Sequence, residues 1–306
     1  MKKKPKTMAF PIELPMETPH KNPTFYVRDC YAQYYDKVLG LLDTPIEGSR
    51  TGSVTITGTS GIGKSVFFAY FFNRYQVDNK EATIITASFD NVSELEEVVV
   101  WKGGKTVASI DYDPAAMRKL ILETQMREER QVKREEWVGM KMPRNKLIFL
   151  YDGPPNNCPE DTQMVCFSSP NATWLNKIKK NEDAETVFMP PWTLAELKVA
   201  ATELKLTLLN EMTVAQKRKL GFEPDAEPTF VELIERRFEI FGGVARECLS
   251  VVPSFVCRRQ DNIDCTINTL WNIAMLKSAL EQGETSADYD CIFLYKPDPE
   301  DGPPTM

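Results

Sequence analysis

The stretch Gly58-Thr59-Ser60-Gly61-Ile62-Gly63-Lys64-Ser65 decides the fold, because it matches the pattern G-x-x-x-x-G-K-[ST] at every fixed position. The β-branched run 53–57 before it predicts a buried strand, and the aromatic-rich run 65–75 after it predicts a helix. Glycines in such a turn let successive backbone N–H groups point inward toward a phosphate. The positive end of the following helix strengthens that attraction. We therefore predict a phosphate-binding loop, or P-loop, between a strand and a helix.

Within this P-loop each residue type has an expected role. The loop and the first helical turn are expected to surround the phosphates of a nucleotide through Gly58, Thr59, Ser60, Gly61, Ile62, Gly63, Lys64, Ser65 and Val66. The Lys64 ammonium can bridge β- and γ-phosphate oxygens as a catalytic residue, and the Ser65 hydroxyl can bind Mg²⁺. A glycine-rich turn that binds no ligand is the competing interpretation.

A second, acidic residue should complete the magnesium site. The hydrophobic run 147–150 predicts a buried strand, and Asp152 follows it, as the Walker B pattern requires. We expect this strand to lie beside the P-loop strand, so that Asp152 and Ser65 bind the same Mg²⁺ ion. The competing interpretation is that Asp152 only begins a turn before Gly153 and Pro154.

The residue after Asp152 departs from many ATPases, which place there a glutamate that polarises the attacking water. Here that residue is Gly153. Either another acid activates water or hydrolysis is slow. The candidate acids are Asp90, which follows the predicted strand 83–87, and then Glu94 and Glu160.

Two further polar positions fit a nucleotide site. Ser168 and Ser169 follow the predicted strand 163–167, where a hydroxyl can sense a γ-phosphate, and we assign this catalytic role to Ser169. A Ser-Pro turn explains the same residues without a ligand. Arg246 follows a Gly-Gly pair at the start of a predicted helix, where it can couple the γ-phosphate to the position of a second domain. A surface arginine in a salt bridge is the alternative.

Periodicity along the chain predicts alternating strands and helices, followed by helices alone. Further strands are predicted at 98–101, 106–108 and 186–189, and helices at 25–42, 113–137, 194–209, 229–241, 245–252 and 266–280. The predicted fold class is therefore α/β, with a parallel-sheet P-loop NTPase core over 25–190 followed by a helical subdomain over 191–296. Residues 1–24 are predicted to be a flexible leader and 297–306 an acidic tail.

The composition is that of an ordinary globular protein and excludes several classes. Hydrophobic residues make up 42% of the 306 residues and charged residues 26%, so wholesale disorder is excluded. Seven cysteines without a C-x-x-C pair, and a lone histidine at position 20, argue against a zinc site and against Ser-His or Cys-His nucleophiles. The chain shows no apolar stretch of about 18 residues and no secretory signal, so we expect an intracellular protein, cytoplasmic or nuclear, with no membrane partner.

The ordered motifs together resemble a known family. Beside the P-loop they are Phe25-Tyr26-Val27-Arg28, Leu150-Tyr151-Asp152-Gly153, Ser168-Ser169-Pro170-Asn171, Met189-Pro190-Pro191-Trp192-Thr193-Leu194-Ala195-Glu196-Leu197 and Phe241-Gly242-Gly243-Val244-Ala245-Arg246. Over about 25 to 295 this set resembles the P-loop NTPase module of Crinkler effectors and retrotransposon hot spot (RHS) proteins. The resemblance implies an additional-strand, AAA-like or STAND-like ATPase in which Asp152 holds Mg²⁺ and Arg246 acts as a sensor. It also implies action in a host nucleus, as for Crinkler members.

Three functions are open from the sequence. The first is a Mg²⁺-dependent switch of the Crinkler/RHS type that binds and hydrolyses ATP. The second is a nucleotide-stabilised interaction protein with little hydrolysis, and the third is a small-molecule P-loop kinase, although no acceptor motif is visible. ATP is expected rather than GTP, because no Asn/Lys-x-x-Asp guanine-reading element stands out.

Partners other than the nucleotide are only loosely constrained. A protein partner or self-association is compatible with each of the three functions. Basic residues outnumber acidic ones between positions 118 and 146, which gives a nucleic-acid partner weak support. The net charge of −7 argues against a surface built mainly for phosphate backbones.

Overall fold

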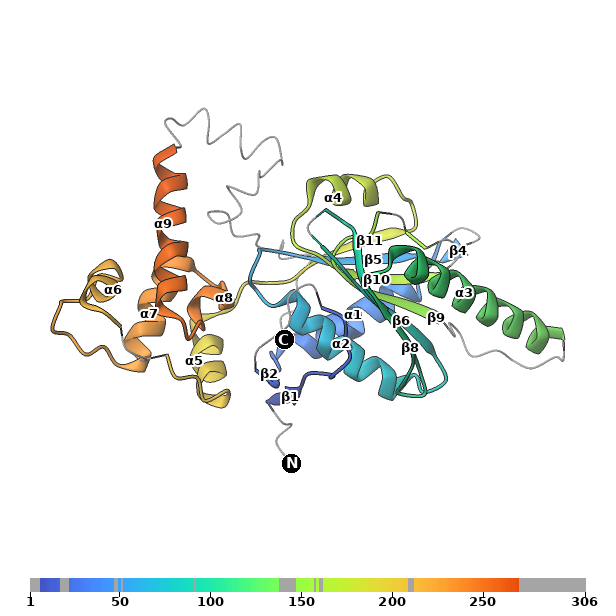
Figure 1. Ribbon diagram of the computed structural model, residues 1–306, viewed down its shortest axis with the longest axis horizontal. Helices are drawn as coiled ribbons and strands as arrows, with labels where there is room; N and C mark the ends of the chain where they lie inside the picture. The colour runs from blue at the N-terminus through green and yellow to red at the C-terminus, as the bar shows by residue number, and fades with distance from the viewer. Residues whose placement is uncertain are drawn as a thin grey trace.

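The computed structural model describes residues 6–16, 22–46, 49–50, 52–90, 92–137, 147–156, 158–159, 162–208 and 212–269. These residues form two parts that lie side by side, a sheet with helices on both faces and a lobe of helices alone (Figure 1). Within the described residues the last strand ends at Phe188 and every later element is a helix. The domain boundary at 190 stays a prediction.

The main sheet has seven strands and is mostly parallel, which confirms the predicted α/β class. Five strands are parallel to one another, in the order β11 (Ala184–Phe188), β5 (Ser53–Thr57), β10 (Gln163–Phe167), β9 (Leu147–Asp152) and β6 (Thr83–Phe89). An antiparallel hairpin, β7 (Leu95–Lys102) and β8 (Lys105–Asp111), extends the β6 edge. The carboxyl ends of the parallel strands therefore meet at one edge of the sheet, where α/β proteins bind ligands.

One expected neighbour relation is wrong. Strand β10 lies between β5 and β9, with Val165 level with Val54 on one side and Leu150 on the other. The strand that ends at Asp152 is therefore not beside the P-loop strand. The chain continues from β9 into β10, and β10 pairs with both β9 and β5. No local sequence pattern indicates which strands become neighbours, so the sequence could not predict this order.

Helices cover both faces of the sheet. One face packs against α1 (Cys30–Leu42) and α2 (Lys64–Asp78), and the other against α3 (Pro114–Trp137) and α4 (Ala172–Ile178). The α2 rings of Phe67 and Phe71 both lie 5.8 Å from the ring of Phe167 on β10. All three side chains are at most 1% exposed, and burial of one such ring contributes about 1.5–3 kcal/mol to stability. This packing anchors the helix that begins at the P-loop.

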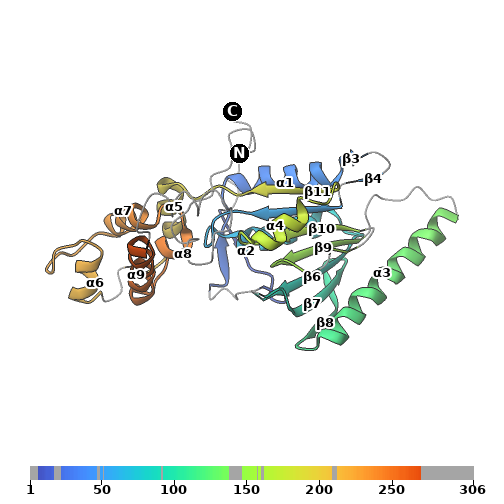
Figure 2. The same cartoon turned by 90° about the horizontal axis from the view of Figure 1, so that it is seen from above.

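The second part, which we call the helical lobe, comprises five helices within the part of the chain that the structure describes. They are α5 (Leu194–Glu203), α6 (Val214–Lys219), α7 (Phe230–Phe241), α8 (Ala245–Cys248) and α9 (Pro253–Thr269). Three of them begin with a capping box, in which Thr193, Thr213 or Thr229 exchanges hydrogen bonds with the residue three positions later. Seen from above, the helical lobe lies beyond the ends of the parallel strands (Figure 2).

Several predicted boundaries are wrong. The predicted flexible leader contains β1 (Thr7–Ala9), which pairs antiparallel with β2 (Thr24–Tyr26), and Leu14 is buried in the core. This pairing joins segments that are distant in sequence, so local composition does not reveal it. The helix predicted over 25–42 accordingly begins only at Cys30. A short hairpin of β3 (Pro45–Ile46) and β4 (Ser49–Arg50), together with α4 and α6, was not predicted.

The later part of the chain shows one further shift. The helix predicted over 266–280 is described only at 266–269, which belong to α9, and α9 begins earlier, at Pro253. A proline fits the first turn of a helix because its missing N–H has no partner there. Residues 270–306, which include the predicted acidic tail, lie outside the described residues.

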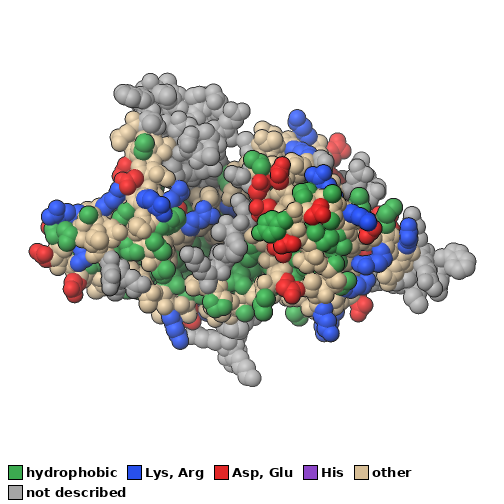
Figure 3. All heavy atoms as spheres, viewed as in Figure 1, with side chains coloured by type: hydrophobic (Ala, Val, Ile, Leu, Met, Phe, Trp, Pro, Cys, Tyr) green, Lys and Arg blue, Asp and Glu red, His purple; other side chains and the backbone are tan. Residues whose placement is uncertain are grey.

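The described surface carries mixed charge. Figure 3 shows acidic, basic and hydrophobic side chains interspersed over one face of the molecule. On α3, Glu128 is buried and accepts a hydrogen bond from Lys102 Nζ at 3.0 Å. Part of the basic segment 118–146 falls outside the described residues, so a nucleic-acid partner stays a prediction. None of the described helices combines the length and the apolar character that crossing a membrane requires.

Candidate functional site

The P-loop connects β5 to α2 at the carboxyl edge of the sheet. Its glycines adopt positive φ angles of +141° at Gly58, +82° at Gly61 and +95° at Gly63. A Cβ atom added at Gly61 would also lie 2.8 Å from Val244 Cγ1 in the helical lobe. Both the left-handed backbone and the lack of space require glycine there. The loop therefore uses backbone angles that favour glycine at these positions, and it touches the lobe.

Lys64 begins α2 and is folded over the P-loop. Its side chain is buried, and Nζ donates hydrogen bonds to the carbonyl oxygens of Gly58 at 2.8 Å and Thr59 at 3.0 Å. Two of the three N–H donors of the ammonium group therefore bond to the loop backbone and hold the group against it. Because Lys64 is the first residue of α2, its ammonium group lies against the first residues of the loop.

Ser65, near the start of α2, and Asp152, at the end of β9, are in direct contact although β10 lies between β5 and β9. Ser65 Oγ donates a hydrogen bond to Asp152 Oδ1 at 2.9 Å, and Asp152 is only 1% exposed. A hydroxyl and a carboxylate are the hard oxygen donors that Mg²⁺ prefers, and together they fit one such ion. No group of three or more His, Cys, Asp or Glu residues suited to a metal occurs in the described ranges. An ion bound here would take its other ligands from phosphate and water.

The residue after Asp152 cannot be a glutamate in this backbone. Gly153 has φ +101°, and a Cβ atom there would lie 2.8 Å from the carbonyl oxygen of Phe89 on β6. Asp90 follows β6 at this edge and is half-buried, but its Oδ1 accepts hydrogen bonds from the N–H groups of Val92 and Glu94. Asp90 therefore stabilises its own turn. Glu94 is exposed, and Glu160 lies outside the described residues.

The two serines after β10 differ in environment. Ser168 is buried, its N–H donates to Ile56 O at 3.0 Å and its Oγ donates to Ser169 O at 2.8 Å. Ser169 is exposed. Because β10 lies between the P-loop strand and the Asp152 strand, Ser169 sits at the edge that carries both. The hydroxyl of Ser168, in contrast, is used within the turn.

Arg246 lies over the P-loop. Its backbone N–H donates to Gly61 O at 3.0 Å, and its Nη1 is 3.5 Å from Ser60 Oγ. Arg246 is the second residue of α8, and its side chain is exposed. The helical lobe thus presents a cation to the loop from the side opposite the sheet. This contact joins segments 186 positions apart in the sequence.

Sequence reasoning missed the roles of several residues around the loop. Trp192 donates its indole N–H to Ile62 O at 2.7 Å. Arg28 is only 2% exposed, and its guanidinium lies over the Trp192 ring. Glu247, also buried, accepts from Arg259 Nε at 2.8 Å and lies beside Gly61. The Thr193–Glu196 capping box was visible in the sequence, but nothing local showed what it would hold in place.

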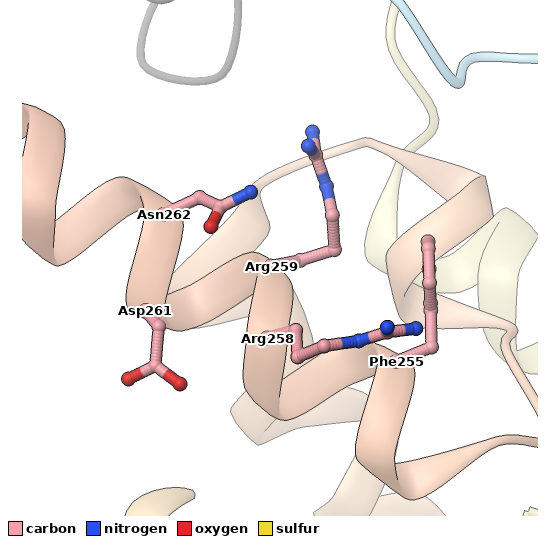
Figure 4. Close-up of a pocket in the computed structure, with 5 residues that line it drawn as sticks. All are labelled: Phe255, Arg258, Arg259, Asp261 and Asn262. Atoms are coloured by element: carbon pink, nitrogen blue, oxygen red, sulfur yellow. The ribbon is translucent and has the colours of Figure 1, made fainter.

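A separate hollow of about 280 Å³ lies over α9 and is lined by Phe255, Arg258, Arg259, Asp261 and Asn262. All five belong to one helix, and the side chains of Arg259 and Asp261 point in opposite directions (Figure 4). They do not converge on a common point. We therefore assign the functional site to the P-loop edge.

Comparisons with known proteins leave the family open. No family model matches the sequence. No curated protein matches it either. Among solved structures, the ORC2 protein of Aeropyrum pernix, in complexes with ADPNP and ADP, aligns with 87% of this chain and 71% of its own at 10% sequence identity and a TM-score of 0.35. A similarity this low carries no argument, so the functional conclusion rests on the geometry of the site.

Proposed function

We propose that this chain binds ATP with Mg²⁺ at the P-loop edge and hydrolyses it as a conformational switch. The observation that carries the proposal is the hydrogen bond from Ser65 Oγ to Asp152 Oδ1, at 2.9 Å, across an intervening strand. It joins the end of the P-loop to the acid of the Walker B pattern, as a shared magnesium site requires.

Each part of the site has a role in this proposal. The backbone N–H groups of residues 58–66 would surround the phosphates, and Lys64 would exchange its carbonyl partners for β- and γ-phosphate oxygens. Ser65 and Asp152 would hold the Mg²⁺ ion, which neutralises charge on the phosphate oxygens when bound. Ser169 and Arg246 would meet the γ-phosphate from the sheet and from the lobe.

The switch follows from where Arg246 is attached. It belongs to the helical lobe, whereas the P-loop belongs to the sheet. A γ-phosphate between them would attract Arg246, and its removal would weaken that attraction. The nucleotide can therefore bias the position of the lobe by its different affinity for two arrangements.

The finer classification is also a proposal. Strand β10 between β5 and β9 supports an additional-strand P-loop NTPase of the AAA or STAND type. The Pro190-to-Glu196 segment and the Gly243-to-Arg246 segment both lie against the P-loop, which gives the motifs of the Crinkler and RHS resemblance a structural role. A nucleotide-stabilised interaction protein with little hydrolysis is the second candidate, because Gly153 excludes a glutamate after Asp152.

The first experiment tests binding. We expect Lys64→Ala to weaken binding of ATP with Mg²⁺ by about 100-fold or more, since it removes charge-assisted hydrogen bonds of roughly 1.5–3 kcal/mol each. Isothermal titration calorimetry measures this, and Lys119→Ala on the exposed face of α3 is the matched control. Equal ATP affinity in the wild type and Lys64→Ala would defeat the proposal.

The second experiment separates a switch that hydrolyses ATP from one that only binds it. Asp152→Asn keeps an oxygen that can accept from Ser65 but loses the charge that attracts Mg²⁺. We expect phosphate release to fall about 100-fold in this variant and binding to lose its dependence on Mg²⁺. Tight binding in the wild type with no phosphate release would favour the interaction protein instead.

A further inference from the structure

Trp192 connects the segment between β11 and α5 to the P-loop. Its side chain is 6% exposed, and its indole Nε1–H donates to Ile62 O at 2.7 Å. Ile62 is the residue between the two loop glycines 61 and 63. This bond joins the segment between β11 and α5 to the middle of the P-loop backbone.

Arg28 holds the same segment from the other side. Its guanidinium lies 4.6 Å from the centre of the Trp192 ring and donates to Pro190 O at 2.9 Å and Pro191 O at 3.1 Å. It also pairs with both carboxylate oxygens of Glu196 at 3.2 Å. Because Arg28 is only 2% exposed, these contacts are little screened by water and restrict the indole to one orientation.

Trp192 also contacts the turn that leads to Arg246. Its backbone N–H donates to Gly243 O at 2.9 Å, and α8 begins two residues later. The Arg246 N–H in turn donates to Gly61 O at 3.0 Å. The contacts therefore close a ring that runs from the P-loop through Trp192, the Gly243 turn and α8 back to the P-loop.

We propose that Trp192 is a positioning residue that sets Arg246 against the P-loop, so that the chain distinguishes ATP from ADP. The proposal rests on the proposed function, since it needs a γ-phosphate for Arg246 to meet. The indole bond to Ile62 fixes how far α8 stands from the loop.

A double-mutant cycle tests this proposal. The quantity measured is the ratio of the dissociation constants for ADP and a non-hydrolysable ATP analogue, both with Mg²⁺. Arg246→Ala should lower this ratio about fivefold or more. Trp192→Phe keeps the ring over Arg28 but loses the N–H donor, and it should lower the ratio in the same way. The double variant should lower the ratio no further than either single change, because both changes remove the same contact, that of Arg246 with the γ-phosphate.

The control is Trp174→Phe, which removes an equivalent buried indole bond. Trp174 Nε1 donates to Thr55 Oγ1 at 3.1 Å, on the other face of the sheet and away from the lobe. This variant should leave the ADP-to-ATP ratio unchanged. A lowered ratio in Trp174→Phe equal to that in Trp192→Phe would overturn the proposal, because general loosening would then explain both.

The remaining outcomes are equally decisive. Additive effects of Trp192→Phe and Arg246→Ala would overturn the inference while leaving Lys64-dependent nucleotide binding intact. A wild-type protein that binds no nucleotide would instead remove the proposed function itself. If Trp192→Phe fails to fold, Arg28→Lys replaces it, because a lysine cannot pair with Glu196 at two points and the ratio should fall again. An unchanged ratio in Arg28→Lys would contradict the proposal.

Discussion

Replacing Arg28 by methionine tests the contacts that join the N-terminal segment to the residues between β11 and α5 and to the first turn of α5. Arg28 makes four hydrogen bonds, two to the backbone oxygens of Pro190 and Pro191 and two to Glu196. Methionine fills a similar volume with an unbranched chain, so the cavity left behind is small. The variant therefore removes the charge and the donors but little of the packing.

The expected loss follows from the burial of the two partners. Breaking a buried ion pair by removing one partner costs about 3–5 kcal/mol, because the other charge is left without compensation. The Glu196 side chain is 20% exposed and regains some contact with water, which favours the lower end. We therefore expect Arg28→Met to lower the free energy of unfolding by about 3 kcal/mol. The double variant Arg28→Met/Glu196→Gln should recover about 1 kcal/mol of that loss, since no uncompensated carboxylate remains.

Urea unfolding followed by tryptophan fluorescence and by circular dichroism measures this change, provided that the two signals change together. Lys119→Met is the control, because the Lys119–Glu123 pair is exposed on both sides and contributes at most about 0.5 kcal/mol. A loss in Arg28→Met below about 1 kcal/mol, similar to the control, would refute the reasoning. The connection would then be held by packing alone.

Three further changes have defined outcomes. Gly153→Ala should lower stability by about 2 kcal/mol or more, because φ is +101° and the new Cβ would lie 2.8 Å from Phe89 O; a wild-type melting temperature would contradict this. Asn171→Ala should cost about 1 kcal/mol in urea unfolding, since it removes the cap of α4, and no loss would mean that the cap is dispensable. Burial alone raises the pKa of the Glu196 carboxyl, but the hydrogen bonds and charge of Arg28 outweigh it and hold the pKa below 4.5. This pair therefore stabilises the fold above pH 4.5 and loses that effect as the pH falls through the lowered pKa. Glu196→Gln should accordingly lose less stability on acidification than the wild type. Equal slopes of unfolding free energy against pH in the two proteins would argue against this.

Local elements of the site could be predicted from the sequence because short-range chemistry determines them. A β-branched run forms β5, glycines allow the positive φ angles of the loop, and Asp152 ends an apolar strand. Each of these depends on residues within a few positions of one another. Asp113 before α3 is a further local case, because its Oδ1 accepts from the N–H groups of Ala115 and Ala116.

The sequence by itself therefore determined the P-loop, its flanking strand and helix, and the acid at the end of β9. Only the tertiary structure decided that β10 separates β5 from β9, and that Ser65 nevertheless meets Asp152. It alone joined Arg28 to Glu196, which lie 168 positions apart, and Trp192 to Ile62, which lie 130 apart. The physical reason is that such contacts depend on which distant surfaces pack together, and packing is a property of the whole chain rather than of any short window.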